Sequence, residues 1–252
     1  MEKYVLITGA SSGIGAATSK FFAAQGWQVA LLGRNIQRLE QTKSECQGRA
    51  SIFSCDLSSG EAVEVTIKTI LKWSSGKLHA LINNAGIYEP GPAVSPNASK
   101  NLQGWRHQFE VNLFSAVYVT ELLLPALAAS APSAVVNVSS TLGLRPIANT
   151  TAYSASKAAM VNWTQGLALE LGSQRVRVNA VCPGLVDTPI HPFHCLKKEE
   201  KDQAIEKLKS LQPLGRIGQA QEIAQAIYFL ASENSSWTTG SVLVVDGGIN
   251  LT

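Results

Sequence analysis

The chain has 252 residues, and its 21 basic and 18 acidic side chains give a formal net charge of +3. Apolar residues make up 45% of it, which excludes intrinsic disorder, because disorder requires low hydrophobicity and a large net charge. Charged residues make up only 15%, against about 25% in an average soluble protein. The small net charge, without blocks of like charge, argues against binding to nucleic acid. The length fits one α/β domain over residues 1–252.

The cysteine pattern predicts no disulfide framework and no metal site. The four cysteines are Cys46, Cys55, Cys182 and Cys195. None forms a C-x-x-C pair or a cluster with zinc spacing, so we expect a reduced cytoplasmic protein. The apolar run Val5–Ile7 is too short for a signal peptide. The most apolar long stretch, Val111–Val138, contains Asn112, Glu121 and two prolines, so we expect no membrane span.

Short β-branched runs alternate with helical segments along the chain. We expect strands at Tyr4–Thr8, Gln28–Leu32, Ser51–Cys55, Ala80–Ile82, Ala134–Val138, Val176–Val181 and Val242–Val245. We expect helices at Ala16–Gln25, Asn35–Glu45, Glu61–Trp73, Trp105–Ala128 and Thr151–Leu171. This alternation is typical of βαβ units. It predicts an α/β fold, a Rossmann-type doubly wound parallel sheet of about seven strands with helices on both faces.

Two irregular segments interrupt the pattern. Tyr88–Gly104 is a loop rich in Pro, Gly, Ser and Asn, and the charged stretch Leu196–Leu211 predicts a mobile helix in a substrate lid at about residues 189–211. In or beside these segments lie aromatic and imidazole side chains that line the site or pack the lid: Tyr88, Trp105, His191, Phe193 and His194. We interpret His107, His191 and His194 as loop or surface residues rather than acid–base catalysts.

The first predicted strand runs directly into a glycine turn. Gly9, Gly13 and Gly15 occur in the segment T-G-A-S-S-G-I-G, which a helix follows. Glycines let the backbone turn tightly and approach a pyrophosphate, and a helix N-terminus offers unpaired N–H groups to an anion. The alternative is a purely structural turn. In its position between strand and helix, the segment predicts a dinucleotide site.

Tyr153 and Lys157 are four residues apart on a predicted helix, so they share one face. The ordinary tyrosine pKa of about 10 is too high for a base near neutrality. A nearby ammonium group favours the phenolate and lowers that pKa. A tyrosine of this kind donates a proton to a carbonyl or takes one from an alcohol. The pair therefore predicts acid–base chemistry.

These motifs together resemble the short-chain dehydrogenase/reductase family, and the resemblance covers nearly the whole chain. The matching motifs are T-G-x-x-x-G-x-G at Thr8–Gly15, N-N-A-G at Asn83–Gly86, Ser140, Y-x-x-x-K at Tyr153–Lys157, Pro183-Gly184, Thr188 and Asp246–Gly248. The resemblance implies a nicotinamide-dependent oxidoreductase. Pro213–Gly218 and Val245–Gly248 are similar to the 3-oxoacyl-carrier-protein reductase branch, although they also occur in sugar, polyol and steroid dehydrogenases.

The resemblance implies four catalytic residues: Asn112, Ser140, Tyr153 and Lys157. Tyr153 would move the proton, and Ser140 would polarise the substrate oxygen. Lys157 would also bind the nicotinamide ribose, and Asn112 would shape the active-site helix and hold a relay water. Ser139 competes with Ser140, because adjacent strand residues point to opposite sides. The alternative for Asn112 is a buried polar residue bonded to backbone.

The resemblance also implies a set of cofactor contacts. They are Gly9, Ser11, Ser12, Gly13, Ile14, Gly15, Arg34, Asp56, Leu57, Asn83, Ala85, Gly86, Tyr153, Lys157, Pro183, Gly184 and Thr188. Asp56-Leu57 matches an adenine contact, although Asp56 could equally cap a helix. Thr188 matches the residue that anchors the nicotinamide amide.

The end of the second strand predicts NADP rather than NAD as the cofactor. An acidic residue there binds the ribose 2′-hydroxyl of NAD, whereas an arginine accommodates the NADP phosphate. In this chain Gly33 occupies the acidic position and Arg34 follows it. A guanidinium group suits phosphate geometry. Some related enzymes carry a second basic residue in the glycine turn, and here that position is Ser12.

We therefore expect an NADP-dependent oxidoreductase that transfers hydride between nicotinamide and a small-molecule carbonyl or secondary alcohol. One alternative is specifically a 3-oxoacyl-carrier-protein reductase, with Arg175 and Arg177 as a basic docking patch. The other is a catalytically silent dinucleotide-binding sensor or scaffold. The low charge and the nearly uncharged Thr151–Leu171 helix also predict a homotetramer or homodimer, the assembly that the resembled family forms, with Gly247–Thr252 at a second interface.

Overall fold

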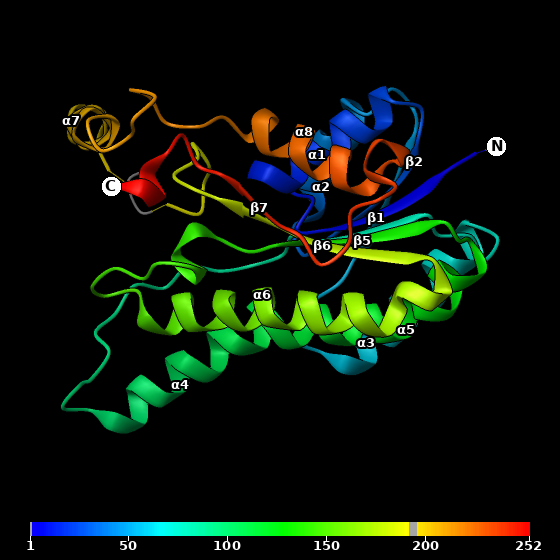
Figure 1. Ribbon diagram of the computed structural model, residues 1–252, viewed down its shortest axis with the longest axis horizontal. Helices are drawn as coiled ribbons and strands as arrows, with labels where there is room; N and C mark the ends of the chain where they lie inside the picture. The colour runs from blue at the N-terminus through cyan, green and yellow to red at the C-terminus, as the bar shows by residue number, and fades with distance from the viewer. Residues whose placement is uncertain (1, 192–195) are drawn as a thin grey trace.

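The computed structural model describes residues 2–191 and 196–252, and its centre is a seven-stranded parallel sheet (Figure 1). The strands are β1 (Tyr4–Thr8), β2 (Gln28–Gly33), β3 (Ala50–Ser54), β4 (Ala80–Asn83), β5 (Ser133–Val138), β6 (Val176–Pro183) and β7 (Val242–Val245). Their order in the sheet is β3-β2-β1-β4-β5-β6-β7. The predicted α/β fold and all seven predicted strands are confirmed, with small shifts at their ends.

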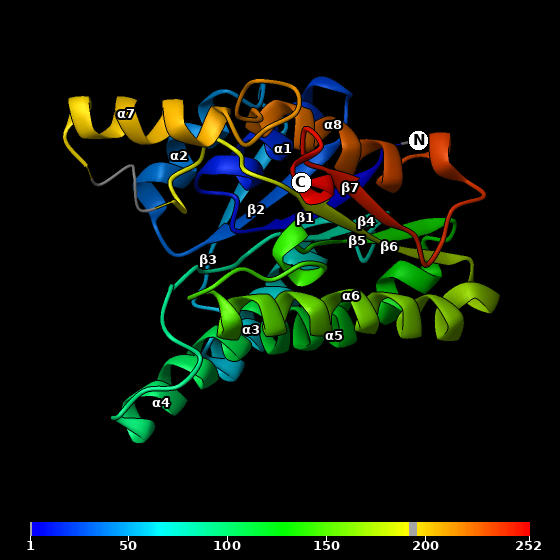
Figure 2. The same cartoon turned by 60° about the vertical axis from the view of Figure 1, so that its left-hand side comes forward.

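Helices cover both faces of the sheet (Figures 1 and 2). One face carries α1 (Gly13–Ala24), α2 (Ile36–Ser44) and α8 (Ala220–Ala231), and the other carries α3 (Gly60–Trp73), α5 (Ser115–Ala129) and α6 (Thr151–Leu171). The helix α4 (Ala98–Phe109) extends α5 beyond the sheet, and α7 (Lys198–Lys209) lies apart from the sheet. Two helical layers around one sheet form the doubly wound arrangement.

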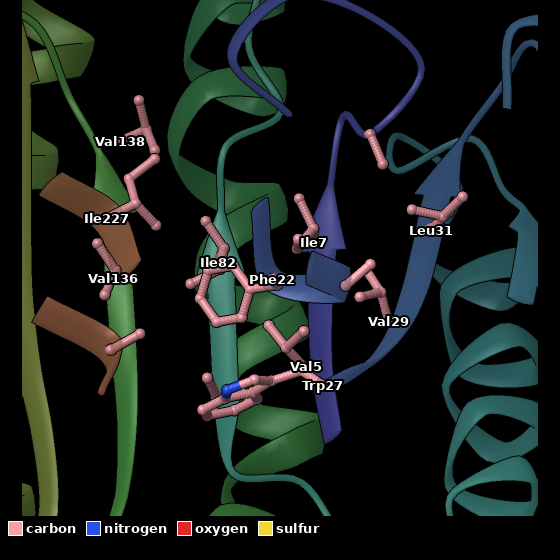
Figure 3. Packing of buried hydrophobic residues seen from close by; sticks show 14 of the residues in the cluster. Val5, Ile7, Phe22, Trp27, Val29, Leu31, Ile82, Val136, Val138 and Ile227 are labelled. Carbon is pink, nitrogen blue, oxygen red and sulfur yellow. The ribbon is translucent and has the colours of Figure 1, made fainter. Parts of the chain in front are cut away.

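The strands are buried on both faces, which explains their continuous apolar runs. Val5 and Ile7 of β1 pack with Phe22 of α1 in one core, whereas Leu6 between them packs in the core on the other side. This alternation follows from the two-residue period of a strand. Figure 3 shows the first core, with Phe22 and Ile227 placed against the strands.

The strand order reverses beside β1, which pairs with β2 on one side and with β4 on the other. The loops after β1 and β4 therefore leave the carboxyl edge of the sheet next to each other. A crevice at such a reversal is where open α/β sheets bind ligands. A Cβ built on Gly9, after β1, would lie 2.9 Å from the Cα of Ala85, after β4.

The predicted helix Trp105–Ala128 differs from the structure in two ways: the observed helix begins earlier, and it is not a continuous α-helix. The helix begins at Ala98, inside the predicted loop Tyr88–Gly104, and a π-helical turn at Glu110–Phe114 separates α4 from α5. Such turns form where tertiary contacts override the regular i→i−4 bonds. The whole stretch Ala98–Ala129 is long and apolar enough to cross a membrane, but half of its apolar window is buried inside the fold, as in a core helix.

One unpredicted helix and one confirmed helix lie in the second half of the chain. The helix α8 was not predicted, although Gln219 and Glu222 form a capping box at its start. The predicted helix in Leu196–Leu211 is confirmed as α7, and none of its residues is buried. Residues 192–195 of the predicted lid, which include Phe193, His194 and Cys195, lie outside the described residues.

Candidate active site

Tyr153 and Lys157 lie on the first two turns of α6 and are both buried. The Lys157 Nζ atom is 5.9 Å from the centre of the Tyr153 ring and donates a 2.8 Å hydrogen bond to the Val138 carbonyl oxygen. The i, i+4 spacing thus places both groups at the carboxyl end of β5, as the sequence predicts.

Ser139 and Ser140 follow β5 and face different partners. The Ser139 hydroxyl donates to the carbonyl oxygen of Lys157 at 2.8 Å. The Ser140 hydroxyl accepts the Leu142 N–H at 3.1 Å and hydrogen-bonds the Tyr153 phenol. The geometry therefore brings Ser140, and not Ser139, to the tyrosine hydroxyl.

Burial is the main cause of the pKa shifts of Tyr153 and Lys157. It raises the pKa of Tyr153 to about 12, and the hydrogen bond from Ser140 opposes that shift only in part. Burial also lowers the pKa of Lys157 from its ordinary 10.5 to about 8. The expectation that Lys157 lowers the tyrosine pKa is therefore wrong for the chain by itself, because desolvation disfavours both charged forms. Both shifts favour the neutral forms of the two side chains.

Asn112 lies in the π-helical turn and is fully buried. Its amide oxygen accepts the Ile87 N–H at 2.7 Å, and its amide nitrogen donates to the Ile87 carbonyl at 3.1 Å and to the Ser156 hydroxyl at 3.1 Å. Asn112 thus joins the loop after β4 to α6. These contacts are those of a buried amide bonded to backbone, which is the alternative to a catalytic role for Asn112. The same contacts fix the loop beside Tyr153.

The glycine turn after β1 has the shape that a pyrophosphate requires. Gly9 and Gly13 have φ angles of +65° and +54°, and a Cβ on Gly15 would lie 2.2 Å from the Gly9 carbonyl oxygen. Side chains larger than hydrogen are therefore excluded at these positions. The cap residue Ser12 makes no side-chain cap hydrogen bond, so it leaves the α1 N–H groups available to an anion.

The residues predicted near the adenosine end lie around the ends of β2 and β3. Arg34 is exposed directly after Gly33, whose Cβ position would be 3.6 Å from Ser11. Asp56 accepts the Ser58 N–H at 3.1 Å and the Ser58 hydroxyl at 2.9 Å. These bonds, with the charge of Arg34 as a lesser cause, lower the pKa of Asp56. Leu57 packs against the core beneath.

Two other predicted cofactor contacts, Gly86 and Asn83, differ in their surroundings. A Cβ on Gly86 would lie 3.2 Å from Asn112 and 3.4 Å from the Lys157 ammonium group, so Gly86 borders the catalytic cluster. The Asn83 side chain instead donates to Thr120 and Asn137 inside the fold. The side-chain amide nitrogen of Asn83 therefore belongs to the interior, and the cofactor contact of this residue stays a prediction.

The segment after β6 borders the same cluster. Pro183 ends β6, and a Cβ on Gly184 would lie 2.6 Å from the Cβ of Asp246, so glycine is required there. The side chain of Thr188 lies 3.2 Å from the Cβ position of Gly13. The residue predicted to anchor the nicotinamide and the glycine turn are therefore neighbours.

Comparisons with known proteins agree over the whole length. A family model described as enoyl-(acyl carrier protein) reductase matches residues 9–250. The 3-oxoacyl-[acyl-carrier-protein] reductase of Thermotoga maritima is 35% identical over 251 residues, which are 98% of this chain and 97% of that protein. The cyclohexanol dehydrogenase of an Acinetobacter species is 34% identical over 98% of this chain and 94% of that protein.

Solved structures agree as well. Thermoplasma acidophilum aldohexose dehydrogenase superposes with a TM-score of 0.88 and 32% identity, over 100% of this chain and 95% of that one. A Caenorhabditis elegans short-chain dehydrogenase/reductase with bound cofactor gives a TM-score of 0.90 and 30% identity, over 99% and 96% of the two chains. The chain belongs to the short-chain dehydrogenase/reductase family.

Membership in the short-chain dehydrogenase/reductase family makes the chain an oxidoreductase that acts on CH–OH or C=O groups with a nicotinamide cofactor. The turn from Gly9 to Gly15, the uncapped start of α1 and the nearby Thr188 fit such a dinucleotide. Nothing in the sequence singled out Gln108, which is buried four residues before Asn112 and bonds the backbone of Glu89.

The predicted basic docking patch is wrong for Arg177. Its guanidinium group donates to the carbonyl oxygens of Leu230, Ser232 and Thr238 and to the Ser235 hydroxyl, at 2.8–3.2 Å. It is a structural link between β6 and the segment after α8. Only the exposed Arg175 of that pair faces solvent.

Proposed function

We propose that this chain is an NADP-dependent oxidoreductase that transfers hydride between nicotinamide and a carbonyl or secondary alcohol, with Tyr153 as the proton donor and acceptor. The observation that carries the proposal is the burial of Tyr153, Ser140 and Lys157 together, with the Lys157 ammonium group 3.4 Å from the Cβ position of Gly86 in the loop after β4. The bound cofactor supplies or accepts the hydride.

The side chains of the cluster have separate proposed roles in proton transfer and in positioning. In reduction, the neutral Tyr153 phenol donates its proton to the carbonyl oxygen, and in oxidation the phenolate takes it from the alcohol. The Ser140 hydroxyl, bonded to the same phenol, stabilises charge on the substrate oxygen. Lys157 lies beside the ring as the adjacent cation when protonated. Asn112 fixes the loop that borders them.

The proposed choice of NADP depends on Arg34. It is an exposed guanidinium at the end of β2, and Gly33 beside it leaves no carboxylate to repel a 2′-phosphate. Arg38, on the first turn of α2, is a second exposed basic side chain nearby. These groups support NADP over NAD by charge complementarity.

A kinetic screen of ketones and secondary alcohols with NADPH and NADP tests the proposal. Turnover that is faster with the phosphorylated cofactor supports it. Turnover that prefers NADH contradicts the cofactor assignment only. Binding of NADPH without turnover on any member of the panel contradicts the enzymatic proposal and favours a catalytically silent sensor.

A 3-oxoacyl-carrier-protein reductase is the second candidate. The Thermotoga maritima relative carries that name, and Pro213–Gly218 and Val245–Gly248 resemble that branch. An acidic carrier protein would need a basic docking surface, and the internal bonds of Arg177 remove one of its two predicted members. Reduction of acetoacetyl-carrier protein at a rate well above that of free ketones would select this candidate.

We further propose that each subunit is a single domain, that residues 189–211 form its substrate lid, and that the protein is cytoplasmic.

The proposed assembly is a homodimer or homotetramer. Leu169 on α6 is 87% exposed, and Phe114 beside α5 is 51% exposed. An apolar hollow of about 370 Å³ lies on the same side, lined by Trp105, Arg106, Phe109, Glu110 and Phe114. Large exposed apolar groups favour a subunit contact. Sedimentation as a stable monomer would contradict it.

A further inference from the structure

Two side-chain amides clamp the loop that follows β4. Asn112 accepts the Ile87 N–H at 2.7 Å and donates to the Ile87 carbonyl at 3.1 Å. One helical turn earlier, Gln108 accepts the Glu89 N–H at 3.3 Å and donates to the Glu89 carbonyl at 3.1 Å. Each amide therefore pairs with both backbone groups of one residue, as a neighbouring strand would.

Tyr88 is the residue between the two clamped positions, so its backbone is tied to the helix on both sides. Its ring meets the ring of Tyr153 edge to face, with centroids 5.0 Å apart and planes at 82°. The His191 ring is a second neighbour of the Tyr88 ring, with centroids 6.4 Å apart and planes at 61°. Edge-to-face contact at this distance is a favoured aromatic geometry. The clamp thus holds a bulky ring directly against the proposed proton donor.

Two segments that adjoin the Tyr88 loop carry exposed apolar side chains. The Gly91 N–H donates to the Asn149 carbonyl at 2.8 Å, which joins this loop to the loop after Ser140. That second loop exposes 60% of Ile147, and the residue before His191 is Ile190, which is 40% exposed. The Glu89 Oε1 atom lies 3.2 Å from the His107 Nδ1 atom. The segment therefore offers hydrocarbon and aromatic surface to a substrate.

We infer that Tyr88 is a specificity-determining residue that limits the width of the substrate group beside the carbonyl, and that Gln108 is the positioning residue that holds it. The site accordingly takes a flat or unbranched apolar ketone, or the matching alcohol, and excludes a branched one. The inference rests on the proposed function, because this width matters only if the carbonyl meets Tyr153.

The test compares two ketones, acetophenone and pivalophenone, in which a tert-butyl group replaces the methyl group. The readout is the ratio of kcat/KM for pivalophenone to kcat/KM for acetophenone. Tyr88→Ala should raise this ratio at least about tenfold, the discrimination that a few methyl groups provide in an apolar pocket. Tyr88→Phe keeps the ring and should stay within about twofold of the parent enzyme.

Gln108→Ala should raise the same ratio, and its matched control is Gln103→Ala, an exposed glutamine on the same helix. Hydrogen exchange of the Glu89 amide should speed up about tenfold or more in Gln108→Ala and stay unchanged in Gln103→Ala. An unchanged ratio in Tyr88→Ala overturns the specificity role. Equal ratios and equal exchange in the two glutamine variants overturn the positioning role.

Failure of the proposed function can be distinguished from failure of the inference about Tyr88. If the parent enzyme turns over neither ketone, calorimetric dissociation constants for both, with oxidised cofactor present, replace the kinetic ratio. Selective tightening of pivalophenone in Tyr88→Ala then supports the inference although the reaction is another one. Equal dissociation constants for both ketones in the parent chain and in Tyr88→Ala overturn it.

Discussion

The ammonium group of Lys157 donates a 2.8 Å hydrogen bond to the carbonyl oxygen of Val138, and the Lys157 carbonyl accepts a 2.8 Å bond from the next residue, Ser139. One residue of α6 is thus tied to two consecutive residues at the end of β5. The following residue, Ser140, is fixed relative to Tyr153 by these two bonds. The geometry of the proposed proton transfer is therefore a property of the strand–helix junction.

Burial of Lys157 predicts a pH dependence of stability. Its pKa falls from 10.5 to about 8 on folding, so between these values the unfolded chain binds more protons. The contribution of Lys157 to the free energy of unfolding should therefore rise with pH between about 8 and 10, by no more than about 3 kcal/mol, whereas the raised pKa of the buried Cys46 acts in the opposite direction above about pH 9. Lys157→Met should remove this rise, and urea titrations at several pH values measure it. Parallel pH profiles for the two proteins would contradict the burial argument.

The two serines after β5 should separate catalysis from stability. Ser140→Ala removes the group that bonds the Tyr153 phenol, and kcat should fall roughly 10²–10³-fold, as on loss of one oxyanion donor. Ser139→Ala removes one of the two bonds that tie the end of β5 to α6, and should cost about 1 kcal/mol of stability with a smaller loss of kcat than in Ser140→Ala. Steady-state rates and urea midpoints for both variants decide the matter. A larger loss of kcat in Ser139→Ala would reverse the assignment.

Arg34 should set the cofactor preference. Arg34→Ala removes a charge-assisted contact to the 2′-phosphate of NADPH, which is worth about 1.5–3 kcal/mol, so the NADPH/NADH ratio of kcat/KM should fall roughly 10–100-fold. Lys43→Ala, at an exposed basic residue in the last turn of α2, serves as the control and should leave the ratio unchanged. Should the ratio stay unchanged in Arg34→Ala as well, NADP would not be selected at this position.

The sheet was predictable because its strands are short and apolar throughout. In β5 all six residues are buried, and no other element type suits such a short run between turn signals. The glycine turn and the Tyr153–Lys157 pair were predictable because the turn lies between a strand and a helix, the pair lies on the helix after the fifth strand, and both match motifs of the resembled family. The helix α8 carried a usable signal in its capping box and in the spacing of Ile223, Ile227 and Leu230.

The remaining features depend on tertiary contacts that no local pattern carries. The π-helical turn exists where Asn112 bonds Ile87 and Ser156, which are 25 and 44 residues away. The sequence predicts Arg177 as a surface group because its four hydrogen-bond acceptors lie 53 to 61 residues away in the chain. The pKa of Tyr153 was predicted in the wrong direction because spacing reveals the neighbouring ammonium group but not the depth of burial.

The most direct test of the account is turnover by Tyr153→Phe, a variant that keeps the ring and removes the proton. The measurement is the rate of NADPH oxidation with the best ketone of the panel, after fluorescence titration has shown that the variant still binds NADPH. The account predicts intact binding and a fall in kcat of roughly 10²–10⁴-fold. Turnover near that of the parent enzyme would contradict the proposal that Tyr153 carries the proton.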